Sequence, residues 1–212
     1  MSDDIIDISP VVSPRIAVWP GDVAFRRTVA LSIAAGDNLE LSSVETTLHV
    51  GAHADAPSHY LLGAPGIGER SLDLYVGPCQ VIAVDVPRGE RIRPNHLPRG
   101  LRITSPRVLF KTGSFPDPER FNEDFVALSP ELVHLVAAEG GRLVGIDTPS
   151  IDPCHDKELR SHAAVAAHDM AVLEGLVLDH VEPGAYTLIA LPLRLAGADA
   201  SPVRAVLLRD EA

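Results

Sequence analysis

The sequence has few of the features that mark secreted or membrane-embedded proteins. Its 212 residues include only two cysteines, Cys79 and Cys154, which are too few and too far apart for a disulfide framework or a paired-cysteine zinc motif. No apolar run reaches the ~20 residues that a transmembrane helix needs, and the amino terminus is acidic where a secretory signal would be basic. We therefore expect free thiols, no membrane partner and a cytoplasmic protein.

Positive charge is also scarce. The chain carries 18 Lys and Arg against 29 Asp and Glu, a formal net charge of −11, which repels phosphate backbones and anionic membrane surfaces. The sequence thus argues against nucleic-acid binding. No internal repeat or linker-like change of composition divides the chain, so we expect one domain over residues 1–212, which is long enough for one substantial core.

Short apolar segments bounded by turn residues predict more strands than helices. The predicted strands are Ala24–Leu31, Leu48–Ala52, Val81–Val86, Arg107–Lys111, Leu143–Ile146, Tyr186–Leu193 and Ala205–Leu208. Ser129 followed by Pro130 predicts a helix that stops before Gly140. A second, Ala-rich helix is predicted from about Ser161 to Met170, with the serine as its N-cap. Because strands and helices are interleaved, we expect an α/β or α+β domain with a mostly β core and flanking helices.

Three histidines and an aspartate share one short segment, at His49, His53, Asp55 and His59. In an extended chain every second side chain points to the same face, so His49, His53 and Asp55 are predicted to point the same way. Gly51 between them leaves the space open. Two imidazoles and a carboxylate on one face are typical of a catalytic zinc site that keeps one position for water. His59 lies outside this register, so it is predicted to be the acid/base, with metal ligation as the alternative.

Ordinary explanations compete with this interpretation. A single histidine in a strand is usually a hydrogen-bonded structural residue, and Asp55 before Ala-Pro could only initiate a turn. The cluster could also hold together a non-catalytic metal-binding protein. The presence of the whole set in one segment favours an open, catalytic metal site.

The pattern His-x-Gly-x-His-x-Asp-x-Pro-x-His resembles the signature of the cyclase-like metal-dependent hydrolases, and within them that of the bacterial kynurenine formamidases, or arylformamidases. Ala52 departs from the wider family's motif, which usually has threonine there. The resemblance implies a single cyclase-like domain of the swivelling β/β/α type. Further segments along nearly the whole chain resemble blocks of the same family: Asp7–Pro10, Val18–Asp22, Leu74–Cys79, Gly145–Pro153, Leu173–Leu176 and Ala190–Leu195.

The resemblance also implies a binuclear zinc site with two ions per subunit, manganese or another divalent ion being the alternative. One ion would be held by His49, His53 and Asp55. The second would be held by Asp55, as a bridge, together with His162 and Glu174. Taken alone, His162 would be a surface residue at the start of a helix. Glu174 is a lone charge in an apolar run and must be paired or metal-bound if it is buried.

The reaction that the resemblance implies is hydrolysis of N-formyl-L-kynurenine to L-kynurenine and formate by a homodimer, with His59 as proton donor. Trp19, the only tryptophan, would stack on the substrate's aryl ring, although a tryptophan more often packs in a core. Hydrolysis of a cyclic amide or imide such as isatin is the nearest alternative, since metal chemistry alone does not choose the substrate. Asp147 and Asp152 flank a Thr-Pro-Ser turn and are predicted to cap it.

Overall fold

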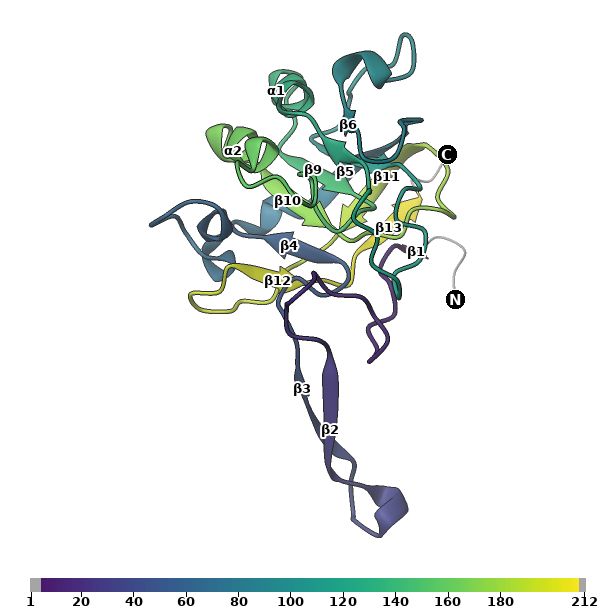
Figure 1. Cartoon of the computed structure of the whole chain (residues 1–212), viewed down its shortest axis with the longest axis vertical. Helices are drawn as coiled ribbons and strands as arrows, with labels where there is room; N and C mark the ends of the chain where they lie inside the picture. Colours follow the sequence, from purple (N-terminus) through teal and green to yellow (C-terminus); the bar gives the residue numbers. More distant parts are fainter. Residues whose placement is uncertain (1–4, 210–212) are drawn as a thin grey trace.

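A nine-stranded mixed sheet organises the chain, which a computed structural model describes over residues 5–209 (Figure 1). Residues 1–4, part of the acidic amino terminus, lie outside the described residues. The strand order is β1-β13-β11-β5-β7-β9-β10-β4-β12, and β5, β7, β9 and β10 run parallel to one another. The strands are β1 (Ile5–Asp7), β4 (His53–Asp55), β5 (Val76–Ala83), β7 (Arg107–Lys111), β9 (Leu143–Ile146), β10 (Ala171–Glu174), β11 (Gly184–Ile189), β12 (Ala200–Pro202) and β13 (Val206–Arg209).

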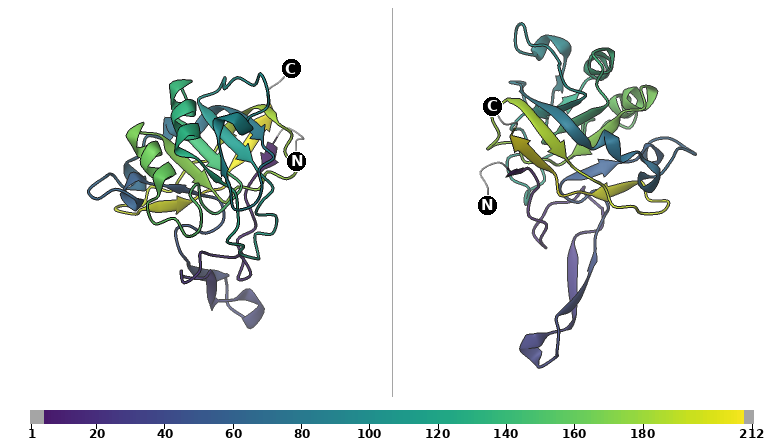
Figure 2. Two further views of the ribbon diagram at one scale, coloured as in Figure 1. Left: turned by 45° about the horizontal axis from the view of Figure 1, so that its top comes forward. Right: turned by 180° about the vertical axis from the view of Figure 1, so that it is seen from behind.

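Two smaller sheets and the helices complete the fold. The ribbon of β2 (Arg26–Leu31) and β3 (Leu41–Glu45) projects away from the body (Figures 1 and 2), whereas β6 (Arg91–Ile92) and β8 (Ala127–Leu128) form a short parallel pair. Among residues 5–209, no helix is long and apolar enough to cross a bilayer. The helices are α1 (Pro130–Ala138) and α2 (Arg160–Ala167), with one-turn 3-10 helices η1 (Ile33–Ala35), η2 (Pro57–His59), η3 (Ile67–Glu69), η4 (Leu72–Leu74) and η5 (Pro94–His96).

Three of the parallel strands, β7, β9 and β10, are buried on both faces. Val108 and Phe110 of β7 belong to a core shared with both helices, which lie on one face of the sheet (Figure 1), while Leu109 between them belongs to the core on the other face. This burial explains why these strands appear in the sequence as continuous apolar runs instead of alternating patterns. The helix core includes Leu132, Val133 and Val136 of α1 and Ala164 and Val165 of α2.

Several predicted elements are confirmed. β7 and β9 have the predicted bounds, and α1 begins after Ser129, whose hydroxyl accepts a 3.2 Å hydrogen bond from the Leu132 N–H. The predicted strands 81–86, 186–193 and 205–208 correspond to β5, β11 and β13 with shifted ends. The predicted α/β class with a mostly β core therefore holds.

The predicted strand Leu48–Ala52 is wrong. The chain turns there, with Gly51 in the left-handed region at φ 60°, and the strand begins only at His53. A left-handed residue interrupts the extended register, so His49 does not share the face of β4. Glycine suits this turn because it adopts a left-handed backbone without strain, and a Cβ at position 51 would also crowd Pro10 Cγ at 3.1 Å. It does not serve to leave space between the imidazoles.

The predicted N-cap of the second helix is also wrong. α2 begins at Arg160, and Ser161 donates its hydroxyl to the backbone carbonyl of Leu128. The helix start is capped instead by Asp152, whose carboxylate accepts hydrogen bonds from the N–H groups of Ser161 (3.1 Å) and His162 (3.0 Å). A carboxylate at this end also interacts favourably with the helix dipole. Spacing could not reveal this cap, since it comes from outside the helix.

Gly175, which follows β10, packs against the turn at Gly51. It has φ +65°, and a Cβ there would lie 2.1 Å from the Gly51 carbonyl oxygen. Gly175→Ala should therefore lower the free energy of unfolding by more than the about 1–2 kcal/mol that a left-handed residue costs, as measured by urea unfolding. Gly197→Ala is the matched control, because Gly197 has φ +69° and open space around an added Cβ. Equal losses in the two variants would show that the contact is unimportant.

Candidate metal centre

Two imidazoles and two carboxylates meet in a buried cluster, here called the inner group: His53 and Asp55 of β4, His162 of α2 and Glu174 of β10. β4 pairs with β10 so that Glu174 is opposite His53. His53 Nε2 lies 3.2 Å from Glu174 Oε2 and 3.5 Å from Asp55 Oδ1. His162 Nε2 lies 3.4 Å from Asp55 Oδ2 and 3.4 Å from Glu174 Oε1. All four residues are at most 3% exposed to solvent.

Several atoms of the inner group are unsatisfied. His53 Nε2, both Asp55 oxygens and His162 Nε2 have no hydrogen-bond partner among the described residues. An unpaired buried polar atom costs about 1–3 kcal/mol, so such a concentration calls for a ligand. A tetrahedral zinc site with bonds of about 2.0–2.1 Å places its donors about 3.3–3.4 Å apart, close to the spacing of these atoms. Within the inner group, His53, Asp55 and Glu174 each offer one donor atom within 4.8 Å of the others, which fits a divalent cation.

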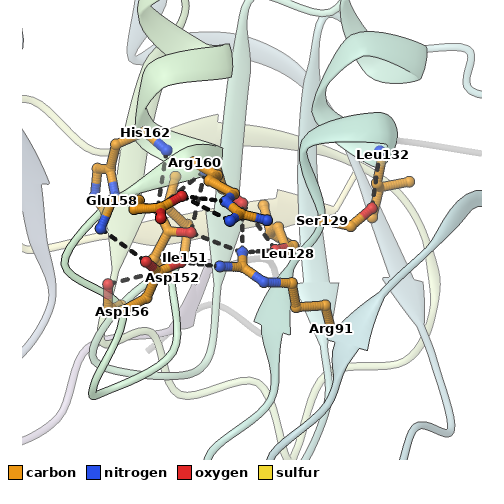
Figure 3. A network of polar contacts seen from close by, with 12 residues as sticks. Arg91, Leu128, Ser129, Leu132, Ile151, Asp152, Asp156, Glu158, Arg160 and His162 are labelled. Atoms are coloured by element: carbon orange, nitrogen blue, oxygen red, sulfur yellow. Dashed lines mark hydrogen bonds and ion pairs between the residues drawn. The ribbon is translucent and has the colours of Figure 1, made fainter.

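Both imidazoles of the inner group are fixed through their other nitrogen. His53 Nδ1 lies 2.9 Å from the Gly51 carbonyl oxygen, and His162 Nδ1 lies 2.8 Å from Asp152 Oδ2. Donation from Nδ1 leaves Nε2 with a lone pair directed into the cluster, as in metal sites whose histidines are oriented by a carboxylate or carbonyl. Asp152 is itself held by Arg91 Nη1 at 2.7 Å (Figure 3).

A second set of donors, the outer group, consists of His49, Asp55 and His59. Their ligand atoms lie within 4.8 Å of one another. His49 Nδ1 is 3.1 Å from Asp55 Oδ1, and the ring centroids of His49 and His59 are 4.3 Å apart. The His59 side chain, at the end of η2, is 35% exposed, so the outer group is open to solvent where the inner group is closed.

The structure brings all five predicted ligands and His59 together. Asp55 contacts both groups, as a bridging carboxylate would. His53 lies with His162 and Glu174 and is also beside the His49 ring, at 5.0 Å between centroids; the assignment of residues to individual ions stays a prediction. His162 is buried, whereas the sequence around it alone predicts a surface position. The hydrogen bond from its N–H to Asp152 holds the start of α2 against the cluster.

Three aspartates at the site have roles that the sequence does not reveal. Asp147 and Asp152, predicted to cap their own turn, instead hold other segments: Asp147 accepts hydrogen bonds from the N–H groups of Thr112 and Gly113, both 2.8 Å, and Asp152 caps α2. Asp199, before β12, contacts His49 and His59. No local spacing links these residues to their partners, so only tertiary structure identifies them.

Carboxylates set the electrostatics of the site. Burial by itself lowers the pKa of His49, but the neighbouring carboxylates of Asp55 and Asp199 outweigh it and raise the pKa from 6.5 to about 9. Burial also lowers the pKa of His162, but the neighbouring carboxylates raise it more, so this pKa lies well above its ordinary value. The pKa of Asp55 is lowered despite desolvation, through His162 and His49. A field that favours protons on imidazoles also favours a divalent cation, which displaces those protons.

The metal-free protein should lose stability at high pH. Because the pKa of His49 is raised from 6.5 to about 9, its contribution is full below pH 6.5 and is lost as pH rises through about 9. A bound divalent ion keeps the imidazole neutral and should remove this loss. Urea unfolding between about pH 6 and pH 10 should show a falling midpoint for the metal-free protein only. Parallel curves with and without zinc would contradict a metal at His49.

A cavity of about 260 Å³ lies beside His49 and His53. Its walls are mainly apolar and include Trp19 and Phe121. The indole of Trp19 packs edge-on against Phe121 and Phe125, with ring centroids 5.4 Å and 6.2 Å away. Trp19 thus belongs to an aromatic cluster and also lines the cavity, and its stacking on a substrate ring stays a prediction.

The family model named Cyclase matches residues 6–153. The chain belongs to the Cyclase family. The match includes the segment with His49, His53, Asp55 and His59, and the motif resemblance to cyclase-like metal-dependent hydrolases agrees with it.

Solved structures of similar proteins extend over nearly the whole chain. A "potential metal-dependent hydrolase with cyclase activity" has a TM-score of 0.83 at 26% identity, covering 98% of this chain and 98% of that chain. A "predicted metal-dependent hydrolase" from Bacillus stearothermophilus has a TM-score of 0.78 at 24% identity, covering 96% and 97%. Isatin hydrolase A from Labrenzia aggregata has a TM-score of 0.77 at 21% identity, covering 98% and 94%. The predicted cyclase-like fold is confirmed.

Proposed function

We propose that this Cyclase-family protein is a metal-dependent amide hydrolase that converts N-formyl-L-kynurenine to L-kynurenine and formate. The observation that carries the proposal is an aromatic-walled cavity that opens onto His49 and His53, at the edge of two adjoining groups of metal-binding side chains. The aryl ring of the substrate would occupy the cavity beside Trp19. The small formyl group would then lie against the imidazoles.

The donor set suits two divalent ions per subunit, zinc first and manganese as the alternative, because imidazole and carboxylate bind both. When bound, such ions lower the pKa of water from ~15.7 to about 7 and polarise a carbonyl oxygen. A thiol nucleophile is disfavoured, since burial raises the pKa of Cys79 to about 12 and the thiolate is the reactive form. The chain's own residues then have to orient the amide and supply a proton.

We assign the supply of that proton to His59. Its ring lies beside His49 in the exposed outer group, and its Nδ1 is 3.3 Å from Asp199 Oδ2. With Nδ1 held there, Nε2 is the nitrogen available for exchange with the departing aryl amine. A positioned donor of this kind typically contributes ~10² to 10⁴-fold in rate.

Two substitutions separate a proton donor from a metal ligand. His59→Ala should keep its metal but lose ~10² to 10⁴-fold in kcat. His53→Ala should lose metal and rate together, because the inner group can no longer hold its ion. Metal content and turnover are measured on the same samples. Loss of metal from His59→Ala would make His59 a ligand.

Formate release from N-formyl-L-kynurenine by the zinc-loaded protein tests the proposed function. Turnover should stop on chelation while the fold persists, since the sheet carries its own apolar cores. Unfolding on chelation, with no turnover before it, would favour the non-catalytic metal-binding alternative.

Trp19→Ala should raise KM more than it lowers kcat, because stacking holds substrate and transition state about equally.

Hydrolysis of a cyclic amide such as isatin is the second candidate. The resemblance in fold to isatin hydrolase A supports it, and a fused aromatic ring would also fit the cavity beside Trp19. Turnover of isatin without release of formate from N-formyl-L-kynurenine would replace the first proposal by this one.

We also propose that the protein forms a homodimer. The β2–β3 ribbon projects from the body (Figures 1 and 2) and exposes apolar side chains. A two-stranded ribbon is marginally stable alone, and exposed apolar patches mark interaction surfaces. A second copy of the chain would cover these side chains, which are Val29, Ile33, Leu39, Leu41 and Val44. The molecular mass in solution tests the proposal and should be twice that of one chain.

A further inference from the structure

Asp199 joins the two histidines of the outer group through a single oxygen. Asp199 Oδ2 lies 3.0 Å from His49 Nε2 and 3.3 Å from His59 Nδ1. His49 lies in the turn before β4, and His59 lies in η2 after it. The carboxylate therefore connects two parts of the motif that β4 separates in the sequence.

The main chain fixes Asp199 against the motif. The Ala56 N–H donates to the Asp199 carbonyl oxygen at 2.8 Å, and the next residue, Ala200, is the β-sheet partner of Asp55. On the other side, the Ile67 N–H donates to the Ala198 carbonyl oxygen at 2.8 Å. Asp199 is thus anchored by the same backbone that carries Asp55. Its position relative to His49 and His59 is set by the sheet, although its side chain is 47% exposed.

An ionised carboxylate only accepts hydrogen bonds, so both rings must donate to Asp199. Donation from His49 Nε2 to Asp199 directs Nδ1 at Asp55 Oδ1, 3.1 Å away. These two atoms share either a proton or a metal ion, and a metal ion would displace the proton. Asp152 orients His162 in the inner group in the same way, through the nitrogen that faces away from the cluster.

We infer that Asp199 is a positioning residue that fixes His49 as a metal ligand through Nδ1 and holds His59 through its Nδ1, which leaves Nε2 of His59 for proton transfer. The part concerning His59 rests on the proposed function. The part concerning His49 does not, because it requires only that the outer group bind a divalent ion. Asp199 would then couple occupancy of the outer group to the orientation of the proton donor.

Zinc release to a chelator tests the inference without any substrate. In Asp199→Ala, one of the two ions should be released faster and bound ~10- to 100-fold more weakly, the usual effect of removing a carboxylate that orients a ligand. The other ion, in the inner group, should leave at the wild-type rate. Asp199→Asn should be intermediate, since the amide oxygen still accepts hydrogen bonds but carries no charge. Asp124→Asn is the matched control, because Asp124 forms an exposed ion pair with Arg88, and it should behave as wild type.

The outcomes separate the two parts of the inference. Unchanged release from Asp199→Ala, or equally faster release of both ions together with a lower free energy of unfolding, would overturn the role at His49. At saturating zinc, Asp199→Ala should still turn over more slowly, because His59 has lost its orientation. Full recovery of the rate would overturn the role at His59. If Asp199→Ala releases one zinc ion faster than the wild type, but the wild type produces no formate, the proposed function would be overturned and the role at His49 would stand.

Discussion

Negative charge buried next to imidazoles is the constraint on which the rest of the site depends. Asp55 and Glu174 are almost fully withdrawn from water, and taking a carboxylate out of water costs several kcal/mol unless opposite charge compensates it. The imidazoles around them can supply that charge only by taking up protons. A divalent ion supplies it more completely and at the donor spacing observed. The local sheet pairing, with β4 between β10 and β12, keeps these carboxylates together.

The two groups of donors divide the requirements of a hydrolytic site between them. The inner group is closed, and its imidazoles are held by a carbonyl and a carboxylate, which favours tight and well-oriented binding. The outer group shares Asp55 but is open to solvent, and it lies where a substrate could approach. Both are positioned at the β10-β4-β12 end of the sheet, while the parallel strands carry an apolar core on each face, with the helices on one of them. Rigid support and access are therefore supplied by different parts of one sheet.

How far the sequence predicts this arrangement depends on how local each signal is. β7 and β9 are predicted to the residue because a continuous apolar run specifies a doubly buried strand by itself. The ligands in one motif are also predicted, since their spacing is local. The path of the chain through Gly51 is not, because glycine is compatible with both an extended and a left-handed backbone. Asp199 and Asp152 act on residues from other segments, so their roles depend on sheet pairing that no spacing encodes.

The double use of Asp152 gives the site a mechanical property. One carboxylate caps the first turn of α2 and orients His162, a residue of that same turn. Fraying of the helix end would therefore release a donor from the inner group, and a donor that left the group would uncap the helix. Helix ends normally open with little free energy, but this one is joined to the closed part of the cluster. Opening of the start of α2 and opening of the inner group are therefore coupled, and a metal ion held by the inner group would leave more easily when that helix end frays.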